Sequence, residues 1–279
     1  RMLTVQIGRF ARRQVQCKSR NLSTYERKTP LEHILLRPGM YIGQVETTSA
    51  DTWIYDEKVE RMVKVNTHYN PALLKIFDEI LVNAADNKQR DSSMTSIDIS
   101  VDRSAENVLT ISVKNDGKGI PLKLHETEKI YVPELIFGHL LTGSNFNDSQ
   151  SRLTGGSHGY GAKLTNIFSN RFEVEAYDPA IGLQYSQQWT ENMSKVSAPT
   201  LTQLGANAGN GYTKVTFQPD LKRFGLTGES KQATGALLDE FVKVFHRRAL
   251  DIAACVAPTK VNFTYQRPIN DTMGSDKAL

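Results

Sequence analysis

The sequence is poor in cysteine, in long apolar runs and in net charge. Two cysteines in 279 residues, Cys17 and Cys255, cannot form a disulfide framework or a zinc site of the usual spacing. We therefore expect an intracellular compartment, and the six scattered histidines indicate no metal cluster. No apolar run reaches the roughly 20 residues that a membrane-spanning helix requires, so we expect no association with a membrane. A formal net charge of +4 is too small to indicate nucleic-acid binding by itself.

The composition is that of an ordinary globular protein, with 39% hydrophobic and 23% charged residues. The length suits one large domain, or one domain with appendages. The first 25 residues differ from the rest because they contain several arginines and no acidic side chain. We interpret residues 1–24 as a flexible basic arm, although a mitochondrial transit peptide has the same composition.

One predicted helix, ending near Arg90, carries a polar stripe. Its polar residues are spaced 4, 3 and 4 apart, which places them on one helical face: Glu79, Asn83, Asp86 and Arg90. Apolar residues lie on a different side, where the core is expected: Phe77, Ile80, Leu81 and Ala84. Polar groups on a largely buried helix cost desolvation unless they meet partners or a ligand. A solvated face with i,i+4 ion pairs is the alternative.

A first glycine-rich element, residues 115–121, follows an alternating strand at 108–113. Its two glycines allow the backbone to come close to a ligand, and Asp116 supplies an acceptor for an exocyclic amine. Alone, this pattern is more typical of a hairpin turn.

A second glycine-rich element, residues 154–163, runs into a helix at 165–168. A loop of this kind offers free N–H groups and the positive end of the helix dipole to phosphate, although a flexible linker is the alternative. It is not a Walker A loop, because Ala162 separates Gly161 from Lys163.

Together these elements resemble the ATPase region of eukaryotic-type DNA topoisomerase II. That region belongs to the GHKL (Bergerat) ATPase superfamily of gyrase B subunits, MutL repair proteins, heat-shock chaperones and sensor histidine kinases. The resemblance covers about residues 25–265, and its most specific stretches are 31–43, 76–87, 132–141 and 215–221.

The order of the predicted elements favours an α+β fold, because strands and helices do not alternate as βαβ units. The resemblance implies the same two-layer sandwich, with a mostly antiparallel sheet, helices on one face and nucleotide between the layers. We expect a basic arm at 1–24, the ATPase domain at 25–265, and a tail at 266–279 that stops before the family's transducer domain. The expected helices cover 30–36, 71–90, 133–141 and 237–254; the expected strands cover 96–101, 108–113, 171–177, 183–190, 214–218 and 260–265, with a hairpin at 51–65.

Several side chains have simpler expectations. We expect Trp53 and Trp189 to pack in the core and Asp78 to be a satisfied surface acid. The last predicted helix should present one apolar side made of Phe241, Val244, Phe245 and Leu250.

The resemblance implies that the site binds ATP with Mg²⁺ and hydrolyses the ATP. Glu79 would orient and deprotonate the attacking water, and Asn83 would be the Mg²⁺ ligand. Asp116 would hold the adenine amine, with Thr213 sharing a water on that edge. The other implied nucleotide contacts are Asp86, Asn87, Arg90, Ile136, Phe137, Ser144, Asn145, Gly156, Ser157, His158, Gly159, Tyr160, Gly161, Ala162 and Lys163, with Tyr25 reaching the partner subunit's nucleotide.

The sequence departs from the family pattern at Ser157 and His158, where eukaryotic topoisomerase II usually has Arg-Asn, so one phosphate contact is expected to be lost. The resemblance further implies a homodimer formed through the N-terminal arm and the ATPase domain, and double-stranded DNA as a partner of the full-length enzyme. It also implies a nuclear location, with a mitochondrion or related organelle as the alternative because of residues 1–25. The family's γ-phosphate lysine belongs to the transducer, so the isolated chain is expected to be a poor ATPase.

Two other functions stay open. A nucleotide-gated dimerisation module would bind without useful hydrolysis, and Glu79 argues against it, since binding alone needs no general base. Another superfamily member, such as a MutL-type repair protein or a chaperone, fits less well because of residues 37–43 and 218–220.

Overall fold

The computed structural model describes residues 26–140, 142, 159–205, 209–227 and 230–268. The helices are α1 (Pro30–Leu36), α2 (Pro71–Arg90), α3 (Val132–Gly138), α4 (Gly161–Ile167) and α5 (Lys231–Val256), with short 3₁₀ helices at η1 (Pro38–Met40) and η2 (Leu221–Phe224). The main-sheet strands are β3 (Ser96–Arg103), β4 (Leu109–Asp116), β5 (Ser169–Asp178), β6 (Leu183–Thr190), β7 (Lys195–Val196), β8 (Thr200–Gln203), β9 (Tyr212–Pro219) and β10 (Lys260–Gln266). A separate hairpin consists of β1 (Thr48–Asp56) and β2 (Arg61–Tyr69).

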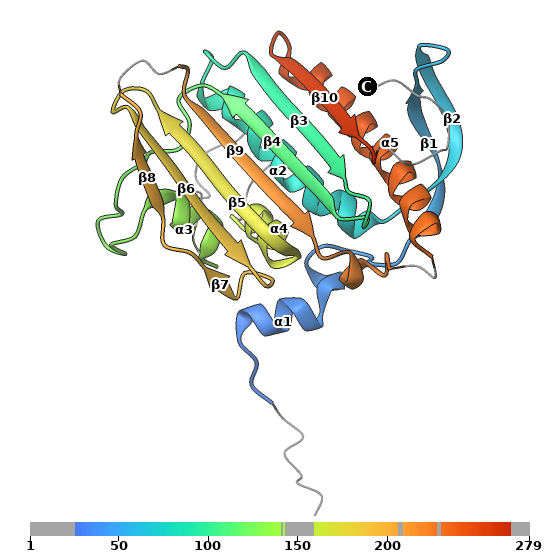
Figure 1. The fold of residues 1–279 in the computed structure, drawn as a ribbon, viewed down its shortest axis with the longest axis horizontal. Helices are drawn as coiled ribbons and strands as arrows, with labels where there is room; N and C mark the ends of the chain where they lie inside the picture. The colour runs from blue at the N-terminus through green and yellow to red at the C-terminus, as the bar shows by residue number, and fades with distance from the viewer. Residues whose placement is uncertain (1–25, 141, 143–158, 206–208, 228–229, 269–279) are drawn as a thin grey trace, which may run out of the picture.

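The main sheet is one layer, and α2, α3, α4 and α5 form the second layer on one of its faces (Figure 1). Its strand order is β10-β3-β4-β9-β5-β6-β7, and β8 pairs with β6. The described pairings are antiparallel except for that of β10 with β3. This arrangement confirms the expected α+β sandwich.

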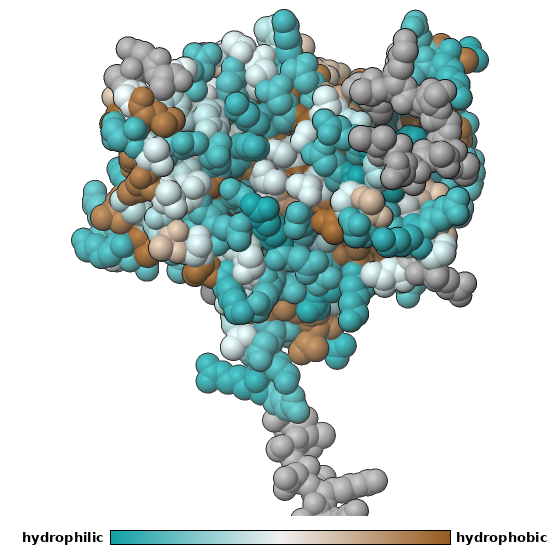
Figure 2. Space-filling view, in the orientation of Figure 1, coloured by the Kyte–Doolittle hydropathy of each residue, from teal (hydrophilic) through white to brown (hydrophobic). Residues whose placement is uncertain are grey.

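Alternating burial along the strands separates a core face of the sheet from an outer face. β3, β4 and β9 each bury every second residue, and the buried residues of β3 and β4 pack into the same core as α2 and α5. Residues of the opposite parity face outward, and Figure 2 shows mostly hydrophilic and neutral residues over these strands. A ligand that binds between the sheet and the helices therefore contacts only every second residue of each strand.

Helix α2 begins and ends where its sequence predicts. Asn70 is the N-cap, because its side chain accepts a hydrogen bond from Leu73 N. The Asn70 amide also donates to Val45 O at 2.7 Å and Phe224 O at 3.1 Å, which ties the start of α2 to two distant segments. The predicted apolar side is buried: Phe77, Ile80, Leu81 and Ala84 are at most 5% exposed.

The hairpin is attached to α5 by polar and aromatic contacts. Glu240 accepts from the backbone N–H of His68 at 3.0 Å, and Tyr55 meets the ring of His246 edge-on. His246 also stacks on Phe263 of β10, and its burial lowers its pKa. These contacts fix the hairpin beside the end of the sheet.

Two expectations about packing are wrong, and two short strands were not predicted. Trp53 is 50% exposed, because it lies on the hairpin away from the main core, whereas Trp189 is buried as expected. Leu250 is 37% exposed, since Ala249 and Ile252 take the core positions of that part of α5. The short strands β7 and β8 were not expected, because their few residues carry no clear alternation.

No helix in the described ranges is long and apolar enough to cross a membrane.

Candidate functional site

Glu79, on the polar stripe of α2, lies against Gly161. Glu79 forms an ion pair with Lys75 one turn earlier, and its side chain is 19% exposed. Asn83 and Arg90 are exposed, whereas Asp86 is buried at 8% exposure. The stripe thus passes from partial burial at Glu79 to solvent at Asn83.

Helix α4 begins against the carboxylate of Glu79. A Cβ built on Gly161 would overlap Glu79 Oε2 and lie 2.6 Å from Glu79 Cδ. Any side chain at position 161 would therefore displace the carboxylate. The helix also starts earlier than expected, at Gly161 rather than 165, because α4 is buried from Ala162 to Ile167 and tertiary packing overrides the low helix propensity of glycine.

Strand β4 places Asn115 and Asp116 on opposite faces. Asn115 is 6% exposed and continues the buried, helix-facing parity of Ile111 and Val113. Its cross-strand neighbour is Thr213, which is also buried on that face. The strand continues through Asp116, beyond the predicted end at 113.

Asp116 is held on the other side by the start of β3. Its carboxylate accepts hydrogen bonds from Thr95 N at 2.8 Å, from Ser96 N at 2.9 Å and from Thr95 Oγ1. Burial works to raise the pKa of Asp116, but these hydrogen bonds outweigh it and lower the pKa overall. The carboxylate therefore has protein partners already, and Asn115 rather than Asp116 lies on the helix-facing side.

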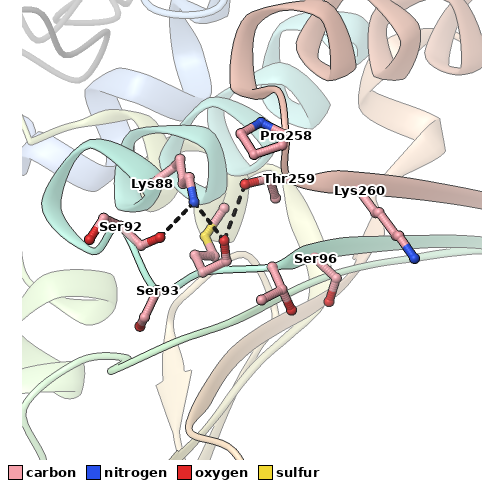
Figure 3. A pocket seen from close by; sticks show the side chains of 9 residues that line it. Lys88, Ser92, Ser93, Ser96, Pro258, Thr259 and Lys260 are labelled. Carbon is pink, nitrogen blue, oxygen red and sulfur yellow. Dashed lines mark hydrogen bonds between the residues drawn. The ribbon is translucent and has the colours of Figure 1, made fainter.

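A pocket of about 350 Å³ lies at this point, between the end of α2 and the start of β10 (Figure 3). Thr95 and Ser96 line it, and the ammonium of Lys88 donates to Ser92 O and Met94 O at 2.8 and 2.7 Å. Thr259 donates to the same Met94 carbonyl. The pocket thus borders the two residues that hold Asp116.

The two glycines after β4, Gly117 and Gly119, allow the backbone of this turn to lie close to other parts of the protein. A Cβ on Gly117 would overlap Oδ2 of Asp91, which is the C-cap of α2 and accepts a hydrogen bond from Lys118 N at 2.7 Å. The pKa of Asp91 is lowered by hydrogen bonds from Ser93 and Lys118. A Cβ on Gly119 would lie 3.4 Å from Thr213 Oγ1. The turn is therefore fixed to both α2 and β9.

Two neighbouring side chains of helix α3, Ile136 and Phe137, differ in exposure. Phe137 is buried against Phe172, with ring centroids 6.0 Å apart, so it belongs to the core. Ile136 is 40% exposed. The backbone carbonyl of Phe137 accepts from the Asn166 amide at 3.0 Å, which ties α3 to α4.

Lys163 is buried, at 1% exposure, in the first turn of α4. Its ammonium donates to Gly159 O at 2.6 Å and to Thr142 O. Burial lowers its pKa to about 8. Here the side chain of Lys163 contacts protein carbonyls.

Other expected site residues lie outside the described ranges: Tyr25, Ser144, Asn145, Gly156, Ser157 and His158. Within those ranges, no group of three or more His, Cys, Asp or Glu side chains is placed to hold a metal ion. Asp78 is a satisfied acid as expected, paired with Arg248 at 2.6 Å. A metal ion at this site would therefore depend on few protein oxygens.

Sequence reasoning missed three residues that the structure brings into the site. The alternation of the strand would have identified Asn115, because Asn115 faces the same side as Val113 and Asp116 faces the opposite side. The i,i+4 spacing would have identified Lys75 as a partner of Glu79. Asp91 gave no sequence signal, because its contact with Gly117 is tertiary.

Comparison with known proteins identifies the family and the fold of the chain. Residues 69–223 match the family model described as "Histidine kinase-, DNA gyrase B-, and HSP90-like ATPase". The DNA topoisomerase 2 of Saccharomyces cerevisiae is 49% identical over 237 residues, which are 85% of this chain and 16% of that protein. The DNA topoisomerase 2-alpha of Gallus gallus is 50% identical over 238 residues, 85% of this chain and 14% of that protein. The chain thus spans about a sixth of the length of these relatives.

Solved structures show the same fold. The ATPase region of Saccharomyces cerevisiae topoisomerase II superposes with a TM-score of 0.76 at 49% identity, covering 86% of this chain and 60% of that one. The ATPase and transducer domains of DNA topoisomerase II from Balamuthia mandrillaris give a TM-score of 0.78 at 48% identity, covering 86% and 59%.

Proposed function

The chain belongs to the histidine kinase-, DNA gyrase B- and HSP90-like ATPase family, and we propose that it is the ATP-operated clamp of a type II DNA topoisomerase. In this proposal the domain binds ATP, hydrolyses it, and drives ATP-dependent passage of one DNA duplex through another. The full-length enzyme would act on double-stranded DNA as a homodimer, joined through the N-terminal arm and this domain, in the nucleus. A mitochondrion or related organelle is the alternative location.

The observation that carries the proposal is the meeting of Glu79 with Gly161. It places a carboxylate at the point where a glycine-rich element enters a helix, beside the backbone N–H groups that favour phosphate. A base in this position can take a proton from water attacking a terminal phosphate. A module that only binds nucleotide would not need it.

Side chains on the helix-facing side of the sheet would form the hydrogen bonds that recognise the adenine base. Asn115 and Thr213 are neighbours on the helix-facing side of β4 and β9, and an amide offers both a donor and an acceptor to a base. Asp116, anchored by Thr95 and Ser96, would support the same turn from the other face. Ile136 would line the adenine pocket. Asp86, Asn87 and Arg90 would make supporting contacts along α2.

Asn83 would hold the Mg²⁺ ion, because it is exposed on α2 one turn beyond Glu79. Mg²⁺ commonly takes one or two protein oxygens and keeps waters and phosphate oxygens as its other ligands, which fits a site without a cluster of protein ligands. The ion would supply charge neutralisation at the phosphates.

A chimaera tests the proposal. The corresponding ATPase region of the Saccharomyces cerevisiae enzyme, 49% identical, would be replaced by residues 26–265 of this chain. We expect the purified chimaera to relax supercoiled plasmid only when ATP and Mg²⁺ are present. Nucleotide-dependent dimerisation without hydrolysis or relaxation would instead support the dimerisation-module alternative, and failure to bind adenine nucleotide would contradict both.

A further inference from the structure

The pocket between the end of α2 and the start of β10 has a basic, hydroxyl-rich lining. Two lysines, Lys88 and Lys260, and five serine or threonine residues line it, and no aspartate or glutamate of the described ranges does. By contrast, the larger groove between the hairpin and α5 contains a complete ion pair, Arg247 with Asp251 at 2.9 Å. A concave site with cations and no acids indicates an anionic ligand. We call this site the Lys88–Lys260 pocket.

The two ammonium groups of the pocket can both reach a ligand. Lys88 is partly buried, and its ammonium donates to the neutral carbonyls of Ser92 and Met94 at 2.8 and 2.7 Å. An ammonium has three N–H donors, so these carbonyls leave one for a ligand. Lys260 is exposed, and its side chain forms no hydrogen bond or ion pair within the described ranges. Figure 3 shows its ammonium directed away from Lys88, and its flexible stem allows it to turn over the pocket.

The nearby carboxylates do not neutralise these lysines. Each accepts hydrogen bonds from other groups: Asp91 from Ser93 and Lys118, Asp116 from Thr95 and Ser96, and Asp98 from Asn262. In the part of the chain that the structure describes, no ion pair joins any of them to Lys88 or Lys260. The positive charge of the pocket is therefore available to a ligand.

The walls of the pocket are held in place by the protein itself. Thr259 donates to Met94 O at 3.2 Å, and Lys260 N donates to Thr95 O at 2.9 Å, so the start of β10 is tied to the segment after α2. Met94 and Pro258 supply apolar surface beside the lysines. A volume of about 350 Å³ is at the lower end for small-molecule sites, so it suits a compact ligand.

Lys88 faces away from the polar stripe of α2. It lies two residues from both Asp86 and Arg90, which turns it roughly 200° from each of them around the helix. The Lys88–Lys260 pocket is therefore separate from the proposed nucleotide site, and an inference about it does not depend on ATP binding.

We propose that the Lys88–Lys260 pocket binds a small organic phosphate monoester. The phosphate group lies between the two ammonium groups and also accepts from the exposed hydroxyl of Ser92, while the carbon part packs against Met94 and Pro258. A phosphate monoester carries a charge of about −1.5 to −2 and three strong acceptor oxygens, which match two lysines and a hydroxyl.

The test is a titration of the complete 279-residue chain with glycerol 3-phosphate, followed by the amide signals in ¹⁵N NMR. Saturable shifts should appear at residues 88–96 and 258–260. Lys88→Met should weaken binding at least about tenfold, because a charge-assisted hydrogen bond is lost. Lys260→Met should weaken it about fivefold, since this ammonium is exposed and has to be ordered on binding.

Lys243→Met is the matched control. Lys243 is an exposed lysine of α5 without an ion pair in the described ranges, so its substitution removes the same charge away from the pocket. Affinity for glycerol 3-phosphate should be that of the wild-type chain. Lys260→Met should unfold at the wild-type midpoint, because its ammonium has no described contact to lose. Its weaker binding would then not come from a damaged fold, even if Lys88→Met disturbs the segment after α2.

Three results would overturn the proposal. Shifts that do not saturate, or an affinity that is equal in wild type and Lys260→Met, would reduce the pocket to nonspecific charge. Equal affinity for inorganic phosphate would remove the assignment to an organic monoester. Shifts of the same residues by a short DNA duplex, without binding of glycerol 3-phosphate, would assign the lysines to a nucleic-acid backbone. If the chain does not bind an ATP analogue, the proposed function fails, while this titration still decides the pocket.

Discussion

Glu79 occupies the space that a side chain at Gly161 would fill. A Cβ at 161 would lie 2.6 Å from Glu79 Cδ, whereas one at Gly39 would meet no atom within 4 Å. The need for glycine at the start of α4 therefore comes from the neighbouring carboxylate as well as from any ligand. Glu79 on α2 and Gly161 at the start of α4 are therefore fitted to one another.

Gly161→Ala should lower ATP turnover about 10²-fold, because the methyl group pushes the Glu79 carboxylate from its place. Stability should change little, since the clash is with the far end of a flexible side chain. Steady-state turnover and thermal unfolding of the variant check this expectation. Gly39→Ala is the control, and equal turnover in the two variants would contradict the fit between Glu79 and Gly161.

Glu79→Gln should keep nucleotide affinity within about threefold and lose about 10²–10⁴ in turnover, because only the proton acceptor is removed. Calorimetry and a phosphate-release assay separate the two effects. Asp78→Asn is the control next in sequence. It breaks the ion pair with Arg248, costs about 1–2 kcal/mol of stability, and leaves turnover intact. Loss of affinity as large as the loss of turnover would make Glu79 a ligand-holding residue instead.

Asn115→Ala should lower affinity for adenine nucleotides about tenfold or more and reduce the preference for adenine over guanine, because a hydrogen-bonding group facing the base is lost. Competition between ATP and GTP analogues measures both quantities. Asp116→Asn should weaken the turn, since its partners Thr95 and Ser96 donate to a carboxylate, but should leave the adenine preference intact. A changed preference in Asp116→Asn alone would assign the base to Asp116.

Lys163 should make stability depend on pH above neutrality. Its pKa in the folded protein is about 8, below the ordinary lysine value of 10.5, so between these values the unfolded chain binds the extra proton. The Lys163 contribution to the free energy of unfolding should therefore rise with pH from about 8, by about 1.6 kcal/mol up to pH 9.5. The measurement is the free energy of unfolding in urea at several pH values, for the wild-type chain and for Lys163→Met. The wild-type value minus the variant value should rise with pH, and a difference that does not change with pH would contradict the prediction.

The sequence predicted the elements best where a local signal and burial agree. Helix α2 has Asn70 as its cap, Pro71 in its first turn and a continuous apolar side, so both of its ends were predicted. The end of β4 was set too early, because Asp116-Gly117 resembles a hairpin turn, whereas pairing with β9 carries the strand through Asp116.

The candidate site was predicted as a set of motifs, but its internal contacts were not. The contacts of Thr95 with Asp116 and of Lys163 with Thr142 join residues 21 positions apart, and no sequence pattern predicts them. Trp53 shows the same limit for packing, since a single aromatic residue on a hairpin gives no periodicity from which to read its 50% exposure.

The opposite orientation of Asn115 and Asp116 makes β4 sensitive to the parity of length changes. One residue inserted in the strand just before Asn115 would turn Asn115 to the outer face and bring Asp116 to the face that Asn115 now shares with Thr213. Two inserted residues would restore the orientation and alter only the reach of the turn. Whether a natural or engineered variant of this strand still binds nucleotide should therefore depend on whether the insertion is odd or even more than on its size.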